Sequence, residues 1–160
     1  DPLPDDIDRR LAVLDDVFAV GPEFGGTRAA ALDAAFPTAR VGDDDVLDPA
    51  GLAVYRRAGY ALAVWTTGSG SRWTESIARA RALELRMYVV VVENSGEPRR
   101  AFAVDPDGVV VAGTFDGYRL ASFLLDPRRT METVVAPGTD VADGLERIAA
   151  IVDREDAPRP

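Results

Sequence analysis

The stretch MYVVVVENSGEPRRAFAVDPDGVVVAG, residues 87–113, decides the fold predicted for this chain. Its first part, residues 87–93, is nearly all apolar, as expected for a strand that is buried on both faces of a sheet. Residues 101–104 and 109–113 then flank the sequence DPDG, where Pro and Gly stand at the positions that a tight turn needs, and so predict a β-hairpin. A buried strand of the parallel type followed by a hairpin predicts a layered α/β domain.

Helices and strands alternate on the N-terminal side of this stretch. Asp48 and Pro49 suit the cap and the first position of a helix over residues 49–58, and residues 60–66 predict a strand. The sequence GSGS at 68–71 predicts a loop, followed by a helix over 72–86. Residues 41–47 predict only a weak, interrupted strand.

The two ends of the chain predict further helices. Apolar residues at helical spacing predict an amphipathic helix over 5–18, and an Ala-rich helix covers about 27–36. Downstream, we expect a strand over 119–125, a helical turn at Asp126-Pro127 and a last helix over 141–152. We therefore divide the chain into an N-terminal helical segment (1–40), an α/β domain (41–152) and a flexible tail (153–160).

Charge and hydropathy favour some classes of partner over others. The net charge is −9 and every basic residue is Arg, so the surface repels phosphate backbones and we expect no nucleic acid partner. No apolar run approaches the roughly 20 residues of a membrane span, so we expect no membrane partner. A hydrophobic fraction of 47% suits a soluble globular protein, and we expect a cytoplasmic one.

The chain contains no Cys, no Lys and no His, which restricts its chemistry. Thiol catalysis and thiolate metal sites are absent, and Ser69 or Ser71 lacks a His or Lys to act as its base. The acidic run Asp43–Asp45 with Asp48 carries oxygen ligands that suit hard cations, but its spacing does not match a calcium-binding loop. We predict a solvated loop or an Arg-binding surface there, and we expect no catalytic residue, metal or cofactor.

A series of short segments in this chain resembles a known family. The segments are Trp73, ARALE (80–84), YVVV (88–91), NSG (94–96), DPDG (105–108) and LLD (124–126). In this order and spacing, residues from Gly59 to Asp126 resemble the C-terminal half of the carbon–nitrogen hydrolases, the nitrilase family. The resemblance implies an α/β fold that is half of an αββα layered sandwich, completed by the N-terminal helices or by oligomerisation.

The same resemblance shows what this chain lacks. The family works through a Glu, a Lys and a nucleophilic Cys, and two of these residue types do not occur here. The segment that resembles the Cys segment is Asp43–Asp48, and counting back from Asp48 makes Val46 the best candidate for the nucleophile position. Valine cannot form a thioester, so the resemblance implies a degenerate site.

A candidate vestigial pocket follows from the resemblance and from helix periodicity. Trp73, Ile77, Ala80 and Glu84 follow steps of four, three and four, so we expect the Glu84 carboxylate on the apolar face, with Arg or backbone N–H partners. The retained pocket would lie at residues of the central strands and the helix between them: Val46, Trp65, Thr66, Glu84 and Asn94.

Three functions remain open on the sequence alone. The first is a non-catalytic subunit that binds and stabilises a partner chain in an oligomeric or heteromeric complex. The second is a regulatory pseudo-enzyme that binds a small molecule, and the third is an amidase-type or nitrilase-type hydrolase whose site another chain completes. Half of the family fold would leave an apolar sheet face uncovered, and we favour a partner protein or a second copy as its cover.

Overall fold

The computed structural model describes residues 36–94, 100–114, 121–144, 146–147 and 150, and its centre is a five-stranded mixed sheet. The strands, in the order in which they lie in the sheet, are β1 (Thr38–Val41), β2 (Leu62–Thr67), β3 (Tyr88–Glu93), β4 (Ala101–Val104) and β5 (Val110–Gly113). The first three run parallel, and β4 and β5 are antiparallel to their neighbours. The predicted α/β class is confirmed, as is the strand over residues 87–93, which lies at the centre of the sheet.

The sequences of β2 and β3 explain their central place. LAVWTT and YVVVVE are rich in β-branched residues, and every residue of β3 is buried. Alternate residues of β3 contribute to two different cores, one on each face of the sheet. Such strands need cover on both sides, which is typical of parallel sheets.

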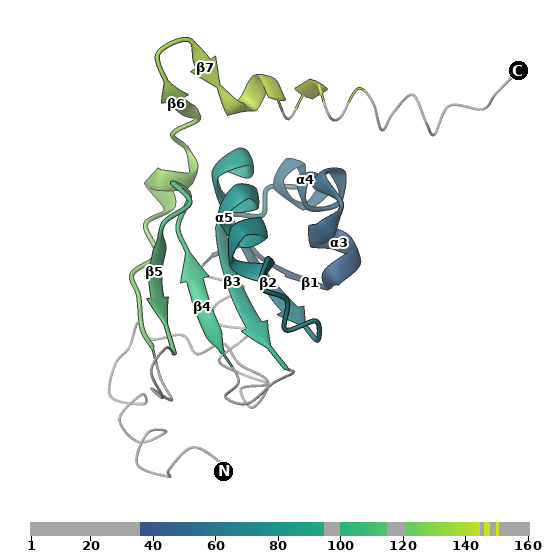
Figure 1. Cartoon of the computed structure of the whole chain (residues 1–160). Coiled ribbons are helices and arrows are strands. Elements are labelled where there is room, and N and C mark those ends of the chain that lie inside the picture. The colour runs from purple at the N-terminus through teal and green to yellow at the C-terminus, as the bar shows by residue number, and fades with distance from the viewer. Residues whose placement is uncertain (1–35, 95–99, 115–120, 145, 148–149, 151–160) are drawn as a thin grey trace, which may run out of the picture.

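Three helices lie together over one face of the sheet: α3 (Asp43–Leu47), α4 (Pro49–Arg57) and α5 (Thr74–Leu85) (Figure 1). As predicted, Asp48 caps α4, because its side chain accepts a hydrogen bond of 2.9 Å from the Ala50 N–H. Helix α5 ends where Arg86 adopts a left-handed conformation with φ 49°. Glycine normally occupies such a position, so the contacts of the Arg86 side chain must offset the cost of the conformation.

The predicted hairpin is present, and its turn packs tightly against α5. Gly108 has φ 74°, and a Cβ atom at this position would lie 3.1 Å from the Arg79 carbonyl oxygen. The Arg79 Nε atom in turn donates a 2.8 Å hydrogen bond to the Gly108 carbonyl. Glycine is therefore required here both for the turn and for the close approach of the helix.

The face of the sheet opposite to the three helices is buried. Its apolar residues are only 1–8% exposed within the single chain: Phe36, Leu62, Val64, Tyr88, Val90, Val92 and Ala103. Phe123 and Leu125 are among the residues that pack against this face, on a segment that enters neither helix nor strand. These residues are thus buried within the single chain, without the partner protein or second copy that we favoured as their cover.

Two predicted strands were wrong. Residues 41–47 end strand β1 and then form helix α3, because Gly42 ends the strand and its N–H donates a 3.0 Å hydrogen bond to Asp45 Oδ2. Three aspartates in the first turn also favour a helix N-terminus. Residues 121–125 are not a strand, because Phe123 and Leu125 pack onto the sheet instead of pairing at its edge, and 119–120 lie outside the described residues.

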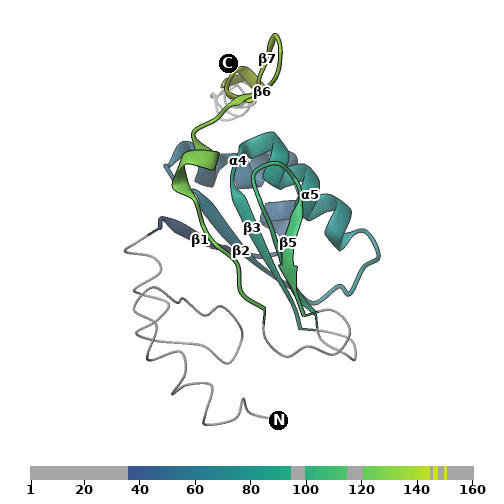
Figure 2. The same cartoon turned by 90° about the vertical axis from the view of Figure 1, so that its left-hand side faces the viewer.

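The C-terminal part holds a confirmed turn and an element that the sequence analysis missed. Asp126-Pro127 starts the short 3₁₀ helix η2 (Pro127–Thr130), as predicted. A hairpin of β6 (Val134–Ala136) and β7 (Thr139–Asp140) follows, and it lies beyond the sheet and its helices in both views (Figures 1 and 2). Residues 141–144, 146–147 and 150 are helical, which agrees with the predicted last helix as far as it is described.

The remaining expectations fall on other parts of the chain. The predicted helices over 5–18 and 27–36 and the tail from 153 lie outside the described residues, apart from Phe36. Among the residues that are described, no helix is both long and apolar enough to cross a membrane.

Candidate functional site

The edge of the sheet where the parallel strands end is the first place to look for a site. Ligands of open α/β sheets bind outside the carboxyl ends of the strands. Here β1 is followed by Gly42 and Asp43, β2 ends at Thr67 and β3 ends at Glu93. We call the polar groups at these strand ends the carboxyl-edge site.

Asp43 and Trp65 form the first pair of the carboxyl-edge site. The indole Nε1 of Trp65, a buried residue of β2, donates a 2.9 Å hydrogen bond to Asp43 Oδ1. An ionised carboxylate is an acceptor, so this bond satisfies the buried indole N–H. The Asp43 side chain therefore holds the Trp65 ring in place.

Thr67 is the second polar group, and its contacts are also local. Its hydroxyl accepts a 3.1 Å hydrogen bond from the Ser69 N–H and lies 3.1 Å from Ser69 Oγ. Its carbonyl accepts a 2.9 Å hydrogen bond from the Asn94 N–H, which ties the loop after β2 to the end of β3. The loop over 68–71, predicted as a connector, is thus fixed at its start by Thr67.

Glu93 and Arg100 form an ion pair at the end of β3. Arg100 Nε and Nη2 donate to the two oxygens of Glu93 at 2.8 and 2.7 Å, a bidentate geometry. Glu93 is buried and Arg100 is partly exposed. The hydrogen bond to Glu93 raises the pKa of Arg100, so the guanidinium stays charged and neutralises the buried carboxylate.

The acidic cluster next to this edge has structural contacts. Asp45 accepts from the Gly42 N–H and from Tyr55 Oη at 3.3 Å, and Asp48 caps α4. The charge of Asp45 raises the pKa of Tyr55. With Asp43 bound to Trp65, three of the four aspartates hold local structure, and no carboxylate cluster suited to a metal occurs within the described ranges.

The five residues of the candidate vestigial pocket are placed in different surroundings. Val46 lies in α3, and its side chain belongs, with that of Trp65, to the core under the helices. Thr66 and Asn94 are exposed at the ends of β2 and β3. Glu84 lies on the outside of α5 and is linked to Val46 only through Arg81, which donates to both the Glu84 carboxylate (2.8 Å) and the Val46 carbonyl (3.0 Å).

The expectation that Glu84 shares the apolar face of its helix was wrong. Its side chain is 55% exposed, and Trp73 is also exposed. The buried face of α5 is offset from the predicted stripe and consists of Thr74, Ala78, Ala82 and Leu85. Small alanines let the helix approach the sheet closely, and alanine carries too weak a hydropathy signal to outweigh Trp73 in a periodicity argument. The expected Arg partner is present as Arg81, three residues earlier.

The sequence analysis considered Asp43 only as part of the acidic run and missed the other polar residues of the carboxyl-edge site. Asp43, Thr67, Glu93 and Arg100 are each the polar residue at or just beyond the end of an apolar strand segment, or the residue that pairs with it. Correct strand ends would have identified the first three. Arg100 had no such signal, because its pairing with Glu93 depends on the reversal of the chain between β3 and β4.

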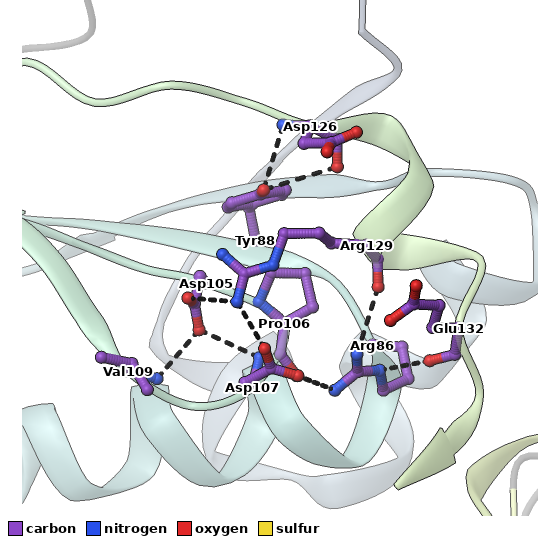
Figure 3. A network of polar contacts seen from close by, with 9 residues as sticks. All are labelled: Arg86, Tyr88, Asp105, Pro106, Asp107, Val109, Asp126, Arg129 and Glu132. Carbon is purple, nitrogen blue, oxygen red and sulfur yellow. Dashed lines mark hydrogen bonds and ion pairs between the residues drawn. The ribbon is translucent and has the colours of Figure 1, made fainter.

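A second polar cluster lies at the other end of the parallel strands, where β3 begins (Figure 3). We call it the clasp, and it joins the end of α5, the β4–β5 turn and the segment after Leu125. Its centre is Arg86, which is 4% exposed and donates to the carbonyls of Pro106 (2.6 Å), Glu132 (2.6 Å) and Arg129 (3.2 Å). The Arg86 guanidinium also pairs with Asp107 Oδ1 at 2.7 Å.

A second arginine completes the clasp. Arg129 pairs with Asp105 Oδ2 at 2.8 Å and with Asp107. Asp105 in turn accepts from the N–H groups of Asp107 and Val109, both at 3.0 Å, and so shapes the turn. The hydrogen bonds from Arg86 and Arg129 hold the pKa of Asp107 below its usual value. Every charged side chain of the clasp is thus bound to another group of the clasp.

These arrangements limit what the site can do chemically. The carboxylates of Asp43 and Glu93 are bound by Trp65 and Arg100, and the whole sequence contains no Cys, Lys or His. Among the described residues, the one buried side-chain polar atom without a hydrogen-bond partner is Thr74 Oγ1. The carboxyl-edge site therefore consists of groups that satisfy one another.

The fold of this chain is similar to that of solved structures. No protein-family model and no curated protein matches the chain. Among solved structures, Saccharomyces cerevisiae Nit3, a member of branch 10 of the nitrilase superfamily, matches 61% of this chain with a TM-score of 0.52 and 19% identity. The Caenorhabditis elegans NitFhit protein matches 61% (0.51, 23%), and a carbon–nitrogen hydrolase from Helicobacter pylori G27 matches 62% (0.51, 16%).

The chain spans only part of these structures, namely 40%, 26% and 43% of their respective lengths. The described α/β unit therefore resembles part of these structures in fold, in a chain that contains no cysteine. At these identities the likeness concerns the fold alone.

Proposed function

We propose that this chain is a non-catalytic nitrilase-fold subunit that acts by binding another polypeptide chain in an oligomeric or heteromeric complex. The observation that carries the proposal is the absence of Cys, Lys and His from the whole sequence, combined with the fold. A chain with this fold but without a thiol nucleophile or a lysine keeps the scaffold and not the reactive groups.

The carboxyl-edge site supports a non-catalytic role. A general base must be free to accept a proton from substrate or water. The Asp43 carboxylate accepts the Trp65 indole N–H, and Glu93 is held by both arms of the Arg100 guanidinium. Using either carboxylate as a base would break a bond that holds the site together.

The surface supports a binding role. Large apolar side chains are exposed on the helices that cover the sheet, including Val54 and Leu83, and on the β6–β7 hairpin, including Val134. Such side chains lose water-exposed apolar area when a partner covers them, which favours binding. The buried second face of the sheet does not contribute to this argument, so the partner would bind on the helical side or at the hairpin.

The proposal is tested by the mass of the native assembly, purified from the organism that makes the chain, with every polypeptide in it identified. A complex with a second copy or with another chain supports a subunit role. A native assembly that consists of one chain overturns it. Amide hydrolysis by the isolated chain that is lost in Asp43→Ala, but kept in the exposed-site control Asp44→Ala, would overturn the non-catalytic part.

A further inference from the structure

Residues 126–140, which we call the latch, contribute little to the apolar cores of the body, that is, of the five-stranded sheet and helices α3–α5. The latch comprises the 3₁₀ helix η2 and the β6–β7 hairpin, and Thr130 is the one buried residue within it. Met131 is 76% exposed and Val134 is 64% exposed. In the described part of the chain, β6 and β7 pair only with each other. Apolar burial therefore contributes little to holding the latch on the body.

Two arginines of the body hold the backbone of the latch instead. Arg56, in α4, donates a 2.7 Å hydrogen bond from Nη2 to the Thr130 carbonyl. Arg86, at the end of α5, donates to the carbonyls of Glu132 and Arg129 at 2.6 and 3.2 Å. Three carbonyls within four residues of the latch are thus bound by side chains that are fixed in the body.

One side chain of the latch reaches back to the body. Arg129 pairs with Asp105 at 2.8 Å and with Asp107, and both aspartates lie in the β4–β5 turn (Figure 3). Where the latch begins, the Asp126 N–H donates a 3.1 Å hydrogen bond to the Tyr88 hydroxyl. Hydrogen bonds and ion pairs that belong to one network support one another, so we expect these contacts to be lost together.

We propose that the latch opens as one unit while the sheet stays folded, and that ionic strength sets how often it opens. A segment with few buried apolar contacts opens at a smaller free energy than the core does. The Arg129 side chain is 37% exposed and that of Asp107 is 48% exposed, so salt screens this ion pair more than it would screen a buried one. Opening takes from Arg56, Arg86 and Asp105 their partners in the latch, and so presents a charged surface near the start of β3. This inference is independent of the subunit role.

Native-state hydrogen exchange of the full-length chain, followed by NMR at single amides, tests the opening. We expect the hydrogen-bonded amides of the latch, such as Met131 N–H, to exchange through one shared opening and faster than those of β3. Arg129→Ala should speed exchange throughout the latch on the order of tenfold or more and leave β3 unchanged, because it removes charge-assisted bonds that only the closed latch forms. Latch amides that exchange as slowly as those of β3 overturn the proposal.

The neighbouring arginine supplies the matched control. The Arg128 side chain is 85% exposed and pairs with Asp126, inside the latch, so Arg128→Ala should leave the exchange rates unchanged. Equal effects of the Arg128 and Arg129 substitutions overturn the proposal. Arg86 is less suited to this test, because it also binds the Pro106 carbonyl and its loss affects the body as well.

Salt tests the second part of the proposal. Raising NaCl from about 0.1 M to about 1 M shortens the screening length from about 10 Å to about 3 Å. Exchange in the latch should then speed up about threefold, with little change in β3. Arg129→Ala should lose most of this salt dependence, since it lacks the exposed ion pair. No salt effect in the wild-type latch, or an effect of the same size in the variant, overturns the role of ionic strength.

Discussion

The two edges of the sheet hold similar polar residues in different arrangements. At the carboxyl edge, Asp43 pairs with Trp65 and Glu93 with Arg100, each within a short reach of one strand end. At the opposite edge, the clasp connects three separate segments of the chain through two arginines and two aspartates, Arg86, Arg129, Asp105 and Asp107 (Figure 3). At the edge that holds ligands in other α/β proteins, the polar groups are thus bound in separate pairs. The largest network instead joins α5 and the β4–β5 turn to the segment after Leu125.

This difference indicates which polar residues of the chain contribute most to its stability. Buried polar networks that are fully satisfied specify one arrangement of the segments they join, and partial loss is costly. The clasp fixes the C-terminal segment against α5 and the hairpin turn. The carboxyl-edge pairs fix only local geometry, so breaking the two sites should have unequal consequences.

The largest effect is expected for Arg86→Ala. The variant leaves three backbone carbonyls without their Arg86 donor and takes one of its two arginines from the Asp107 carboxylate, and the free energy of unfolding should fall by about 3 kcal/mol or more. Urea denaturation followed by circular dichroism measures this loss. Arg86→Gly is the matched control, since it removes the same side chain but relieves the left-handed backbone, and should lose about 1 kcal/mol less. A loss below about 0.5 kcal/mol in Arg86→Ala would contradict the role of the clasp.

The carboxyl-edge ion pair should give a smaller and asymmetric effect. Arg100→Ala leaves the buried Glu93 carboxylate without its partner and should reduce the free energy of unfolding by about 1–3 kcal/mol. Glu93→Gln leaves only the partly exposed Arg100, which can turn to solvent, and should cost about 1 kcal/mol or less. The same urea experiment compares them. Equal losses, or a loss in Arg100→Ala larger than in Arg86→Ala, would reverse the comparison between the two edges.

The sequence predicted the central fold well, for a physical reason. The unbroken apolar run over 87–93 and the sequence DPDG each allow few conformations, and both are found as predicted. Residues 41–47 were misassigned because aspartates in a short helix and in a strand end look alike in sequence. The hydrogen bond from Gly42 to Asp45 decides between them.

The candidate site was harder to predict than the fold. Glu84 was placed on the buried face because Trp73 and Ile77 outweigh alanines in any hydropathy pattern, yet alanines form most of the contact with the sheet. Arg86 gave no signal, since a buried arginine depends on carbonyls and carboxylates that are distant in sequence. Long-range pairing of this kind cannot be read from local periodicity.

Acid should weaken the clasp. Because Arg86 and Arg129 lower the pKa of Asp107 in the folded state, this carboxylate contributes stability above its unfolded pKa of about 3.9. The contribution is lost as the pH falls below this value and through the folded pKa. Asp107→Asn should therefore flatten the decrease in thermal stability between pH 5 and the acid limit, measured by calorimetry.

The matched control for the acid experiment is a carboxylate outside the clasp. Asp143→Asn is the same chemical change at an exposed carboxylate that forms no ion pair within the described residues, and it should leave the acid profile unchanged. An equal effect of both variants would attribute the acid dependence to net charge and not to the clasp.

Single cysteines give the sharpest view of the carboxyl edge. Because the chain has none, a thiol introduced at 43 or at 46 is the only one that a thiol reagent can modify. Position 43 is partly exposed at the start of α3, whereas Val46 in the same helix is fully buried, so we expect Asp43→Cys to react quickly in the folded protein and Val46→Cys to react only when it unfolds. Fast labelling of Val46→Cys with slow labelling of Asp43→Cys would instead place position 46 at the open edge, as the resemblance suggested. The rates in urea, where both thiols are free, supply the reference for each variant.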